Sequence, residues 1–499
     1  MFSITHEEEN TKARLGKLVL PKSSITLKTP CFIGSTKRGF VRHLTPDNLI
    51  NIPDLELLSI NLPQIIYKPG LTILKRFNKH CQESSETKKS VEETKKEEKE
   101  NSNKIFQEEK KQEKEKEKEK EKEKKIEIEK EKEIEIENKT VTEKDNNKQN
   151  QIKDGLKRYY GIGSKHALLL KIRNSEFADF YYPSTDEKIA CCASEGTKVF
   201  ITPSQYMEFA SEINPDITVS PAIEVVGNNK RDKIEKAIKR SMKWLNIAIS
   251  KKTSRTGSLF AVIHAVEDPK IRNKYLDRLL TIVKSGKVDG FMFGCLFLNE
   301  SRIERKKRIG QIIESIPNEL PRGIVGDATL SQILDCVENG IDLINSSFPL
   351  RLTELNLVLN YQNPLQNLRS ENKNKNENKN KNENKNENEN ENIEIENENK
   401  NEFKKQFEPL LFNLRNVKYE DDNKPFVVGC QCFACKNHTR QYVYHLISVR
   451  EMTAMILMNL HNLYQYSLFF KDMRWAIKND KFIQFKEAIQ LLEKSNTKK

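Results

Sequence analysis

Short runs of apolar residues alternate with longer amphipathic stretches between residues 198 and 349. The runs have the length of β-strands and read KVFITP, DITVSPAIEV, LFAVIHAV, GFMFGCLF, GIVGDAT and DLINSSFP. The stretches that separate them have the length of helices and include residues 230–250, 269–285 and 301–315. Strands and helices that alternate in this way predict a parallel sheet with helices outside it. With this many units, we expect an α/β protein built on a TIM-type (β/α)8 barrel.

Residues 1–82 combine strand-like runs with one clear helix start. LGKLVL and ITLKTPCFIGST are apolar enough to form strands. In the run LTPDNLI, Thr45 and Pro46 resemble a helix N-cap followed by proline at the first helical position. We therefore expect residues 1–82 to form an ordered N-terminal segment that joins the barrel.

Two low-complexity segments interrupt the folded pattern. Residues 83–153, which include EKEKEKEKEKEKK, and residues 370–402 consist mostly of Lys, Glu, Asn and Gln. Such segments cannot bury apolar surface, so we expect two disordered charged inserts. Between them we place the barrel at 154–369, and after them a C-terminal module at 403–499. The flanks of the second insert can lie side by side, because long surface insertions cost little free energy.

Composition indicates the compartment. The first ten residues lack a basic start followed by an apolar core, and no apolar run reaches the roughly 18 residues of a membrane span. Nine cysteines, an odd number, fit a reducing compartment, in which we expect Cys191 and Cys192 to be ordinary strand or loop residues. We expect a soluble, cytoplasmic protein.

The charge is compatible with a polyanionic partner. The net charge is +13, and residues 424–499 hold twelve Lys or Arg against five Asp or Glu. An RNA phosphate backbone is a plausible ligand for such a surface. The alternative is a solvated basic face without a ligand.

The C-terminal module carries a metal-binding pattern. Cys430, Cys432, Cys435 and His461 form the series CxCxxCx25H, and a Met- and Leu-rich stretch with helical spacing carries the histidine. Three thiolates and one imidazole form the closed ligand set of structural zinc, so we expect one Zn2+ per chain. The alternative is three buried or redox-active cysteines with an unrelated histidine. His445 is a rival ligand, but it more readily packs or forms hydrogen bonds among its aromatic neighbours.

The sequence around these ligands resembles one known family. CxCxxC, the run TRQYVYHL, the helix bearing His461 and the later FKEAI are similar to the zinc module of the tRNA-guanine transglycosylases. Members of that family are barrel proteins that exchange a base in tRNA. Their reaction passes through a covalent bond between a carboxylate and the ribose C1′.

The resemblance assigns the nucleophile position to an amide. Catalytic members carry a run of the form GxDxFDxxxPTR, and the matching run here is GIDLINSSFPLR, residues 340–351. Its first aspartate aligns with Asp342, whereas the nucleophile aligns with Asn345. A neutral amide is a poor nucleophile for this step.

The second functional carboxylate is also replaced. The family run DIVMAFDE resembles DITVSPAI, residues 216–223, and its aspartate aligns with Ala222. Glu224 could substitute after a local shift. Where catalytic chains read VQGG and GGLAxGE, this chain reads IHAV at 263–266 and GCLFLNE at 294–300, without most of the glycines that admit a base. His264, near a strand end, is better explained as a structural histidine than as a catalytic one.

A chain that keeps the family's barrel and zinc motifs but lacks its two functional carboxylates resembles the accessory, non-catalytic subunits of eukaryotic queuine tRNA-ribosyltransferases. The resemblance implies a heterodimer with a catalytic subunit and a tRNA partner, in which queuine replaces guanine at the wobble position of tRNAs with GUN anticodons (Asp, Asn, His, Tyr). The zinc module would then support assembly. The resemblance also allows a peripheral association with the mitochondrial outer membrane. The alternatives are a self-sufficient transglycosylase with relocated carboxylates and a zinc-containing RNA-binding scaffold.

Overall fold

The computed structural model describes seven stretches of the chain, residues 1–83, 155–172, 184–192, 198–225, 230–298, 300–366 and 409–496. The two charged inserts expected from composition lie outside the described residues, apart from Glu83. Two compact units can be distinguished. The larger unit comprises Met1–Lys68, Lys165–Ser211 and Pro215–Lys499, and the smaller one Pro69–Ser164 and Glu212–Asn214.

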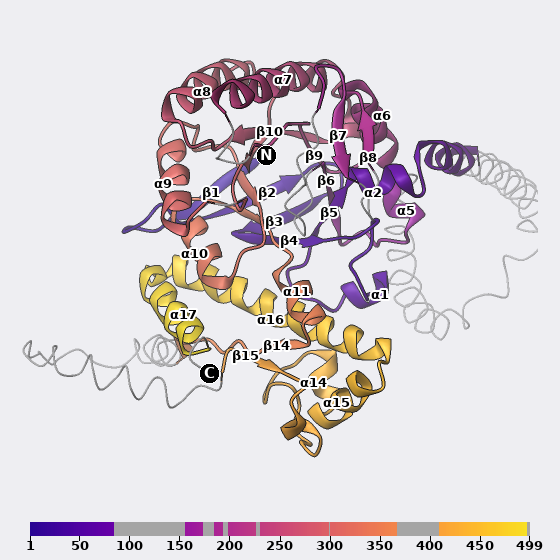
Figure 1. Cartoon of the computed structure of the whole chain (residues 1–499), viewed down its shortest axis with the longest axis vertical. Coiled ribbons are helices and arrows are strands. Elements are labelled where there is room, and N and C mark those ends of the chain that lie inside the picture. Colours follow the sequence, from indigo (N-terminus) through magenta and orange to yellow (C-terminus); the bar gives the residue numbers. More distant parts are fainter. Residues whose placement is uncertain are drawn as a thin grey trace, which may run out of the picture. The chain divides into compact units, whose positions relative to one another are not determined.

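Eight parallel strands form a closed barrel in the larger unit, which confirms the expected (β/α)8 architecture (Figure 1). In order around the barrel they are β4 (Cys31–Ser35), β5 (Leu57–Asn61), β6 (Ala167–Lys171), β9 (Ile217–Val219), β10 (Ser258–His264), β11 (Gly290–Gly294), β12 (Arg322–Val325) and β13 (Leu343–Asn345). The ring closes where β13 pairs with β4. The N-terminal segment therefore joins the barrel by supplying two of its strands.

The barrel strands are buried on both faces, as parallel strands covered by helices must be. Every described residue of β5, β6, β9, β11, β12 and β13 is buried. The inward side chains of the eight barrel strands form one core that includes Ile33, Leu169, Phe260, Met292 and Leu343.

One run that was expected to be a strand of the parallel sheet is placed differently. KVFITP forms β8 (Lys198–Ile201), which pairs antiparallel with β7 (Ile189–Cys192) in a separate two-stranded sheet. Lys198 and Phe200 are exposed, so β8 has the half-exposed pattern of a hairpin strand. Cys191 is an ordinary buried strand residue, as expected.

Helices cover the outside of the barrel. The stretches expected to be helical form α7 (Arg231–Ser250), α8 (Pro269–Val283) and α9 (Arg302–Ile313). Thr45 is the N-cap of α1 (Pro46–Leu49), with Pro46 in the first turn, as predicted. Other helices that lie wholly or mostly in the larger unit, before the C-terminal module, are α2 (Leu62–Tyr67), α6 (Pro203–Ile213), η2 (Ser254–Thr256), α10 (Leu330–Glu338) and α11 (Phe348–Glu354). The smaller unit contains α5 (Leu156–Tyr159) and a helix over residues 71–83.

An antiparallel sheet covers the amino-terminal end of the barrel. It consists of β1 (Phe2–Glu7), β2 (Arg14–Leu20) and β3 (Ile25–Thr29), and it lies across the barrel in Figure 1. Leu18 and Leu27 of this sheet share a core with Leu57 and Leu343, which begin their barrel strands. The opposite, carboxyl-terminal end is where barrel enzymes place their chemistry.

The C-terminal module is built around one long helix, α16 (Met452–Lys478). The ring of Phe32 in β4 packs on Tyr466 and Phe470 of α16, and Arg474 donates to the Pro30 carbonyl oxygen and pairs with Asp54. The other elements are η3 (Val417–Tyr419), α14 (Phe433–Asn437), α15 (Arg440–Ser448) and α17 (Phe482–Asn496). β14 (Leu357–Leu359) pairs with β15 (Leu411–Asn413), so the flanks of the second insert do lie side by side.

Candidate functional site

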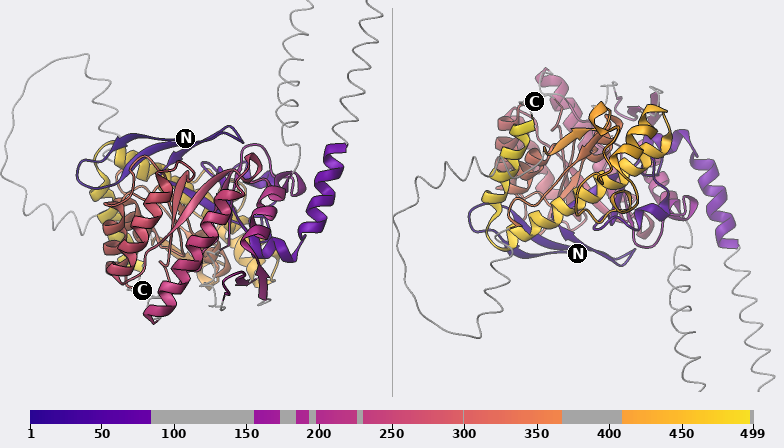
Figure 2. Two further views of the ribbon diagram at one scale, coloured as in Figure 1. Left: turned by 90° about the horizontal axis from the view of Figure 1, so that it is seen from above. Right: turned by 90° about the horizontal axis from the view of Figure 1, so that it is seen from below.

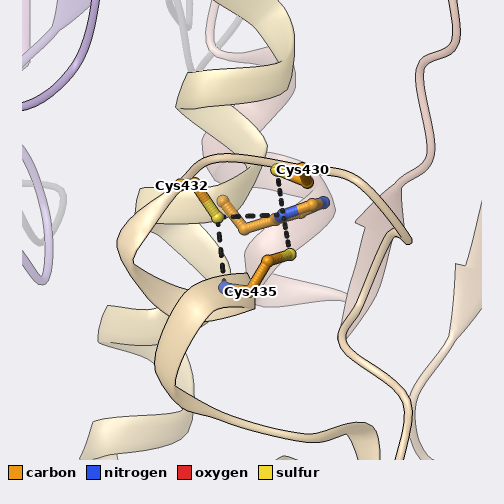
Figure 3. Close-up of side chains that lie close together, drawn as sticks. Cys430, Cys432 and Cys435 are labelled. Carbon is orange, nitrogen blue, oxygen red and sulfur yellow. Dashed lines mark hydrogen bonds between the residues drawn. The ribbon is translucent and has the colours of Figure 1, made fainter.

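Four side chains of the C-terminal module converge on one point (Figure 3). Cys430 and Cys432 lie in the turn before α14, and Cys432 is the N-cap of that helix because its sulfur accepts from the Cys435 amide at 3.3 Å. The N-terminal turn of α14 thus places Cys435 beside the other two thiols. His461 projects from α16, the helix predicted to carry it.

The distances fit a tetrahedral metal ion. The Sγ atoms of Cys430, Cys432 and Cys435 lie 3.8, 3.4 and 3.3 Å from His461 Nδ1, and all four ligand atoms lie within 4.8 Å of one another. In tetrahedral zinc coordination, bonds of about 2.3 Å to sulfur and about 2.0 Å to nitrogen put sulfur and nitrogen about 3.5 Å apart. These four residues can therefore hold one metal ion without rearrangement.

Neighbouring groups orient the candidate ligands. His461 is fully buried, and its Nε2 donates to the Leu359 carbonyl oxygen at 2.9 Å, which leaves Nδ1 directed at the thiols. Gln465 donates to Cys430 Sγ at 3.2 Å. Hydrogen bonds from the thiols of Cys432 and Cys435 lower the pKa of Cys430, which favours the thiolate that binds metals.

The rival histidine is not part of this cluster. His445 lies on α15, is exposed, and does not join the four ligands. The apolar side chains that pack around the cysteines are those of Val358, Phe426, Val443 and Met458. The site is thus the centre of a small core of its own.

Asn345 ends β13 at the carboxyl-terminal end of the barrel, which we call the barrel mouth. Its side chain is fully buried, and Nδ2 donates to the Ile33 carbonyl oxygen at 3.0 Å and to Ser59 Oγ at 3.2 Å. These hydrogen bonds hold the amide group against β4 and β5. A buried carboxylate at this position would face the Ile33 carbonyl, with which it could form no hydrogen bond unless protonated.

Ala222 and Glu224 follow β9 at the same end. Ala222 is half-buried and packs against the barrel core. Glu224 Oε2 accepts from the Cys295 amide at 2.6 Å, directly after β11. A Cβ added to Gly294 would lie only 3.0 Å from the Glu224 carboxyl carbon, so the two strand ends are in close contact. Glu224 therefore joins two strand ends, which gives it a structural role.

Phe297 is a residue of the barrel mouth that sequence reasoning missed. It has a φ of 57°, and its ring lies where a Cβ on Gly326, at the end of β12, would be only 2.3 Å away. Glu300 accepts from the Phe297 amide at 2.6 Å and from Arg305, whose guanidinium stacks on the Phe297 ring at 3.7 Å. This loop thus holds an aromatic ring against the glycine at the end of the neighbouring strand.

A second missed residue is Asp327, the only carboxylate in the predicted strand run GIVGDAT. It follows β12 and forms an ion pair with Arg351, the arginine of the run at 340–351. Burial raises the pKa of Asp327 despite this partner. The sequence signal that could have identified Asp327 is its position as a charged residue near the end of an apolar run.

Asp342 lies at the opposite end of the barrel. It precedes β13, is fully buried, and forms a two-pronged ion pair with Arg14 of β2, with distances of 2.9 and 2.7 Å. Its Oδ2 also accepts from the Arg322 amide at 2.8 Å. Asp342 therefore attaches the N-terminal sheet to the barrel and lies away from the mouth.

His264 ends β10 and is fully buried, with its ring edge-on to Tyr275 and Nδ1 3.6 Å from Cys295 Sγ. Burial lowers the pKa of His264 to about 4, so the ring is neutral at physiological pH. The surroundings agree with the structural role expected of it.

Burial of His264 predicts a loss of stability in acid. The unfolded chain, with an ordinary histidine pKa of about 6.5, takes up the proton before the folded chain, with a pKa of about 4. The free energy of unfolding should therefore fall as pH drops through this window, by about 2 kcal/mol between neutral pH and pH 5. Urea unfolding of the His264→Gln variant should show a correspondingly smaller loss. His445→Gln, which removes an exposed histidine, is the control, and equal pH dependence in all three proteins would contradict the prediction.

Among the described residues, no helix combines the length and apolarity needed to span a bilayer.

Known proteins match this chain over most of its length. A relative from Homo sapiens, named queuine tRNA-ribosyltransferase accessory subunit 2, is 29% identical over 304 residues, which cover 58% of this chain and 70% of that protein. A relative of the same name from Danio rerio is 25% identical over 346 residues, covering 68% and 80%. A Clostridium perfringens protein named queuine tRNA-ribosyltransferase is 27% identical over 304 residues, covering 58% and 66%.

The family model described as queuine tRNA-ribosyltransferase matches residues 116–494, which is more than half of the 499 residues. The match confirms the resemblance seen in the sequence motifs. This chain belongs to the queuine tRNA-ribosyltransferase family.

Proposed function

We propose that this chain is a non-catalytic subunit of a queuine tRNA-ribosyltransferase, which pairs with a catalytic subunit and supports exchange of guanine for queuine at the wobble position of tRNAs with GUN anticodons. The observation that carries the proposal is Asn345. It occupies the strand end that matches the family's nucleophile, and its amide is held by hydrogen bonds to β4 and β5. An amide cannot form and release the glycosyl ester that a carboxylate nucleophile forms.

The other groups at the mouth support the same reading. Glu224 is bound to the backbone after β11, and Asp327 is paired with Arg351, so both carboxylates already have structural partners. The Phe297 ring lies against Gly326, where a base entering from the mouth would need room. Exchange chemistry requires a free carboxylate and an open pocket together, since positioning supplies much of the rate.

We further propose that Cys430, Cys432, Cys435 and His461 bind one Zn2+. Three thiolates and one imidazole suit zinc, and the protein itself supplies all four corners of the tetrahedron. No corner is left for water or substrate, so the metal would stabilise the module rather than take part in chemistry. In this way the site would support assembly of the heterodimer.

The surface of the module fits a protein partner. Phe433, Tyr442, Val428 and Met452 are 53%, 41%, 71% and 67% exposed, which is unusual for large apolar side chains. His438 stacks on Tyr442 and lies 5.9 Å from the Phe433 ring, so α14 and α15 present an aromatic row. Aromatic side chains are enriched at protein interfaces, and we propose that this row contacts the catalytic subunit.

The decisive measurement is incorporation of labelled queuine or guanine into tRNA by the pure chain, by a pure catalytic subunit and by their mixture. We expect the pure chain to be inactive and the mixture to be active. Phe433→Asp should abolish the activity that depends on mixing, because it buries a charge in the interface. Ile303→Asp is the matched control: Ile303 is 81% exposed on α9, apart from α14 and α15 (Figure 1), and its replacement should leave the mixture active.

The alternatives predict different outcomes. Activity from the pure chain that is lost in Glu224→Gln or Asp327→Asn would establish a self-sufficient enzyme with relocated carboxylates. A chain that neither co-purifies with a catalytic subunit nor changes its activity would instead be an independent RNA-binding scaffold. Asn345→Asp alone should restore little activity, because the mouth would remain obstructed by Phe297.

A further inference from the structure

Positive charge is concentrated on helices α7 and α8, outside the C-terminal module in which the sequence indicated a basic surface. Together they contain ten Lys or Arg against three Asp or Glu. The two helices run side by side on the outside of the barrel (Figures 1 and 2). The charge is therefore gathered on one outer surface of the barrel.

The lysines of this surface are all exposed to solvent, and they take no part in the ion pairs of the described residues. Lys233, Lys236, Lys239 and Lys243 on α7, and Lys270 and Lys274 on α8, are all exposed. Within the part of the chain that the structure describes, none of these six forms an ion pair, whereas Arg231 pairs with Glu235 and Arg240 with Asp186. We call these six lysines the α7–α8 basic face.

Some of the cations on other elements are neutralised within the protein. On α9, Arg302 pairs with Asp335, Arg305 with Glu300, and Arg308 with Glu304. In residues 424–499, where the sequence indicated a basic surface, Arg440, Arg474 and Lys486 form ion pairs with Asp422, Asp54 and Asp335. The exposed cations of residues 424–499 that form none of these pairs, among them Lys436, Arg450 and Lys471, are spread over separate elements, whereas the α7–α8 basic face holds six exposed lysines on two neighbouring helices.

The arrangement follows from the amphipathic pattern of α7. Its buried residues, among them Ile234, Ile238 and Leu245, recur at helical spacing toward the barrel. The four lysines are three or four residues apart on the outer side, so they place one charge about every turn along roughly 15 Å of helix. Lys270 and Lys274 add a parallel row on α8, one turn apart. Two rows of regularly spaced cations complement a chain of phosphates.

We propose that the α7–α8 basic face binds the phosphate backbone of RNA. An anionic membrane would also attract lysines, but membrane-binding helices add apolar anchors, and none of the large hydrophobic residues found exposed in the described chain lies on α7 or α8. The contact is electrostatic and independent of sequence. That the RNA is the body of the substrate tRNA rests on the proposed function.

The test compares two full-length variants of equal net charge. In one, Lys233, Lys236, Lys239 and Lys243 are replaced by Gln. In the control, Gln replaces Lys17, Lys28, Lys471 and Lys478, which are exposed on other elements. Each variant lowers the net charge of +13 by four, to +9. Binding of a tRNA transcript is measured without the catalytic subunit over a range of salt concentrations, beside binding to vesicles of phosphatidylserine and phosphatidylcholine.

We expect the α7 variant to bind tRNA at least tenfold more weakly at about 0.1 M salt, with a salt dependence of log K shallower by about 3. The control variant should stay within about twofold of the unmodified chain. Equal losses in both variants, no loss in either, or a loss seen only with vesicles would each overturn the proposal. The catalytic subunit is absent from this binding assay, so the two proposals can fail separately. If the exchange assay with mixed subunits failed, the proposed function would be refuted, but the assignment of RNA binding to the α7–α8 basic face would not.

Discussion

Replacing Cys432 with Ser is expected to remove the metal and to unfold much of the C-terminal module. Zinc content should fall from one ion per chain to near zero, because a hydroxyl is a weak ligand beside two thiolates and an imidazole. Zinc binding at structural sites contributes about 10–16 kcal/mol, which becomes folding free energy when the apo site does not form on its own. Elemental analysis and limited proteolysis of residues 409–496 measure the two effects.

The structure explains why the loss should spread beyond the site. Cys432 is 3% exposed, caps α14 and contacts the same apolar cluster as Val443, Leu446 and Met458. His461 connects the cluster to β14 through the Leu359 carbonyl oxygen. Without the metal, α14 and α15 would rest on a small core alone, since short helices gain most of their stability from packing.

Cys191→Ser is the matched control for this experiment. Cys191 is also buried, at 8% exposure, but it lies in β7, and its thiol donates to the Val199 carbonyl oxygen, a bond that a serine hydroxyl can also form. Zinc content should be unchanged in this variant. A well-folded Cys432→Ser protein that keeps its metal, or unmodified protein that contains none, would refute the assigned ligand set.

Features encoded locally in the sequence could be predicted. The four candidate metal ligands lie in one turn and one helix, so spacing alone indicated them. Helices α7, α8 and α9 agree with the expected ranges to within about two residues, because amphipathic periodicity marks a helix that covers a sheet.

Features that depend on distant partners could not be predicted. β5 (LLSIN) and β6 (ALLLK) are short, mostly apolar runs that are buried throughout, and periodicity alone does not distinguish such a strand from a buried segment of helix. KVFITP was assigned to the barrel because its composition is that of a buried strand. Its pairing with β7, which the chain alone does not reveal, makes it a hairpin strand.

The residues of the candidate site could be predicted only in part, again because some of them depend on partners that are distant in the sequence. Asp342 and Asn345 are three residues apart in one motif, yet a strand advances about 3.3 Å per residue, so they lie about 10 Å apart toward opposite ends of the barrel. Sequence similarity assigns both to one functional run, whereas their contacts give Asp342 a structural role. Phe297 was missed because its position matters only against Gly326, on the neighbouring strand.

Replacing Arg14 with Met is expected to destabilise the barrel by about 3–5 kcal/mol, the usual cost of removing one partner from a buried ion pair. The side chains of Arg14 and Asp342 are 2% and 0% exposed. Methionine fills a similar volume, so the main loss is electrostatic and leaves a carboxylate buried without its cation. The free energy of unfolding, measured in urea, should fall accordingly. Lys12→Met is the matched control, because its partner Glu314 is 69% exposed and surface pairs contribute at most about 1 kcal/mol.

A double-mutant cycle separates the ion pair from the packing of the two side chains. If Asp342 is only a structural partner, Arg14→Met combined with Asp342→Leu should cost less than the sum of the two single changes, since no charge then remains buried. Arg14 also donates to the carbonyl oxygens of Asn318 and Leu320, so part of its loss should persist in the double variant. If Asp342 took part in chemistry instead, Asp342→Leu would change exchange by the mixture with a catalytic subunit more than it changes the folded fraction. We expect exchange to follow the folded fraction alone, because Asp342 lies at the end of the barrel that the N-terminal sheet covers.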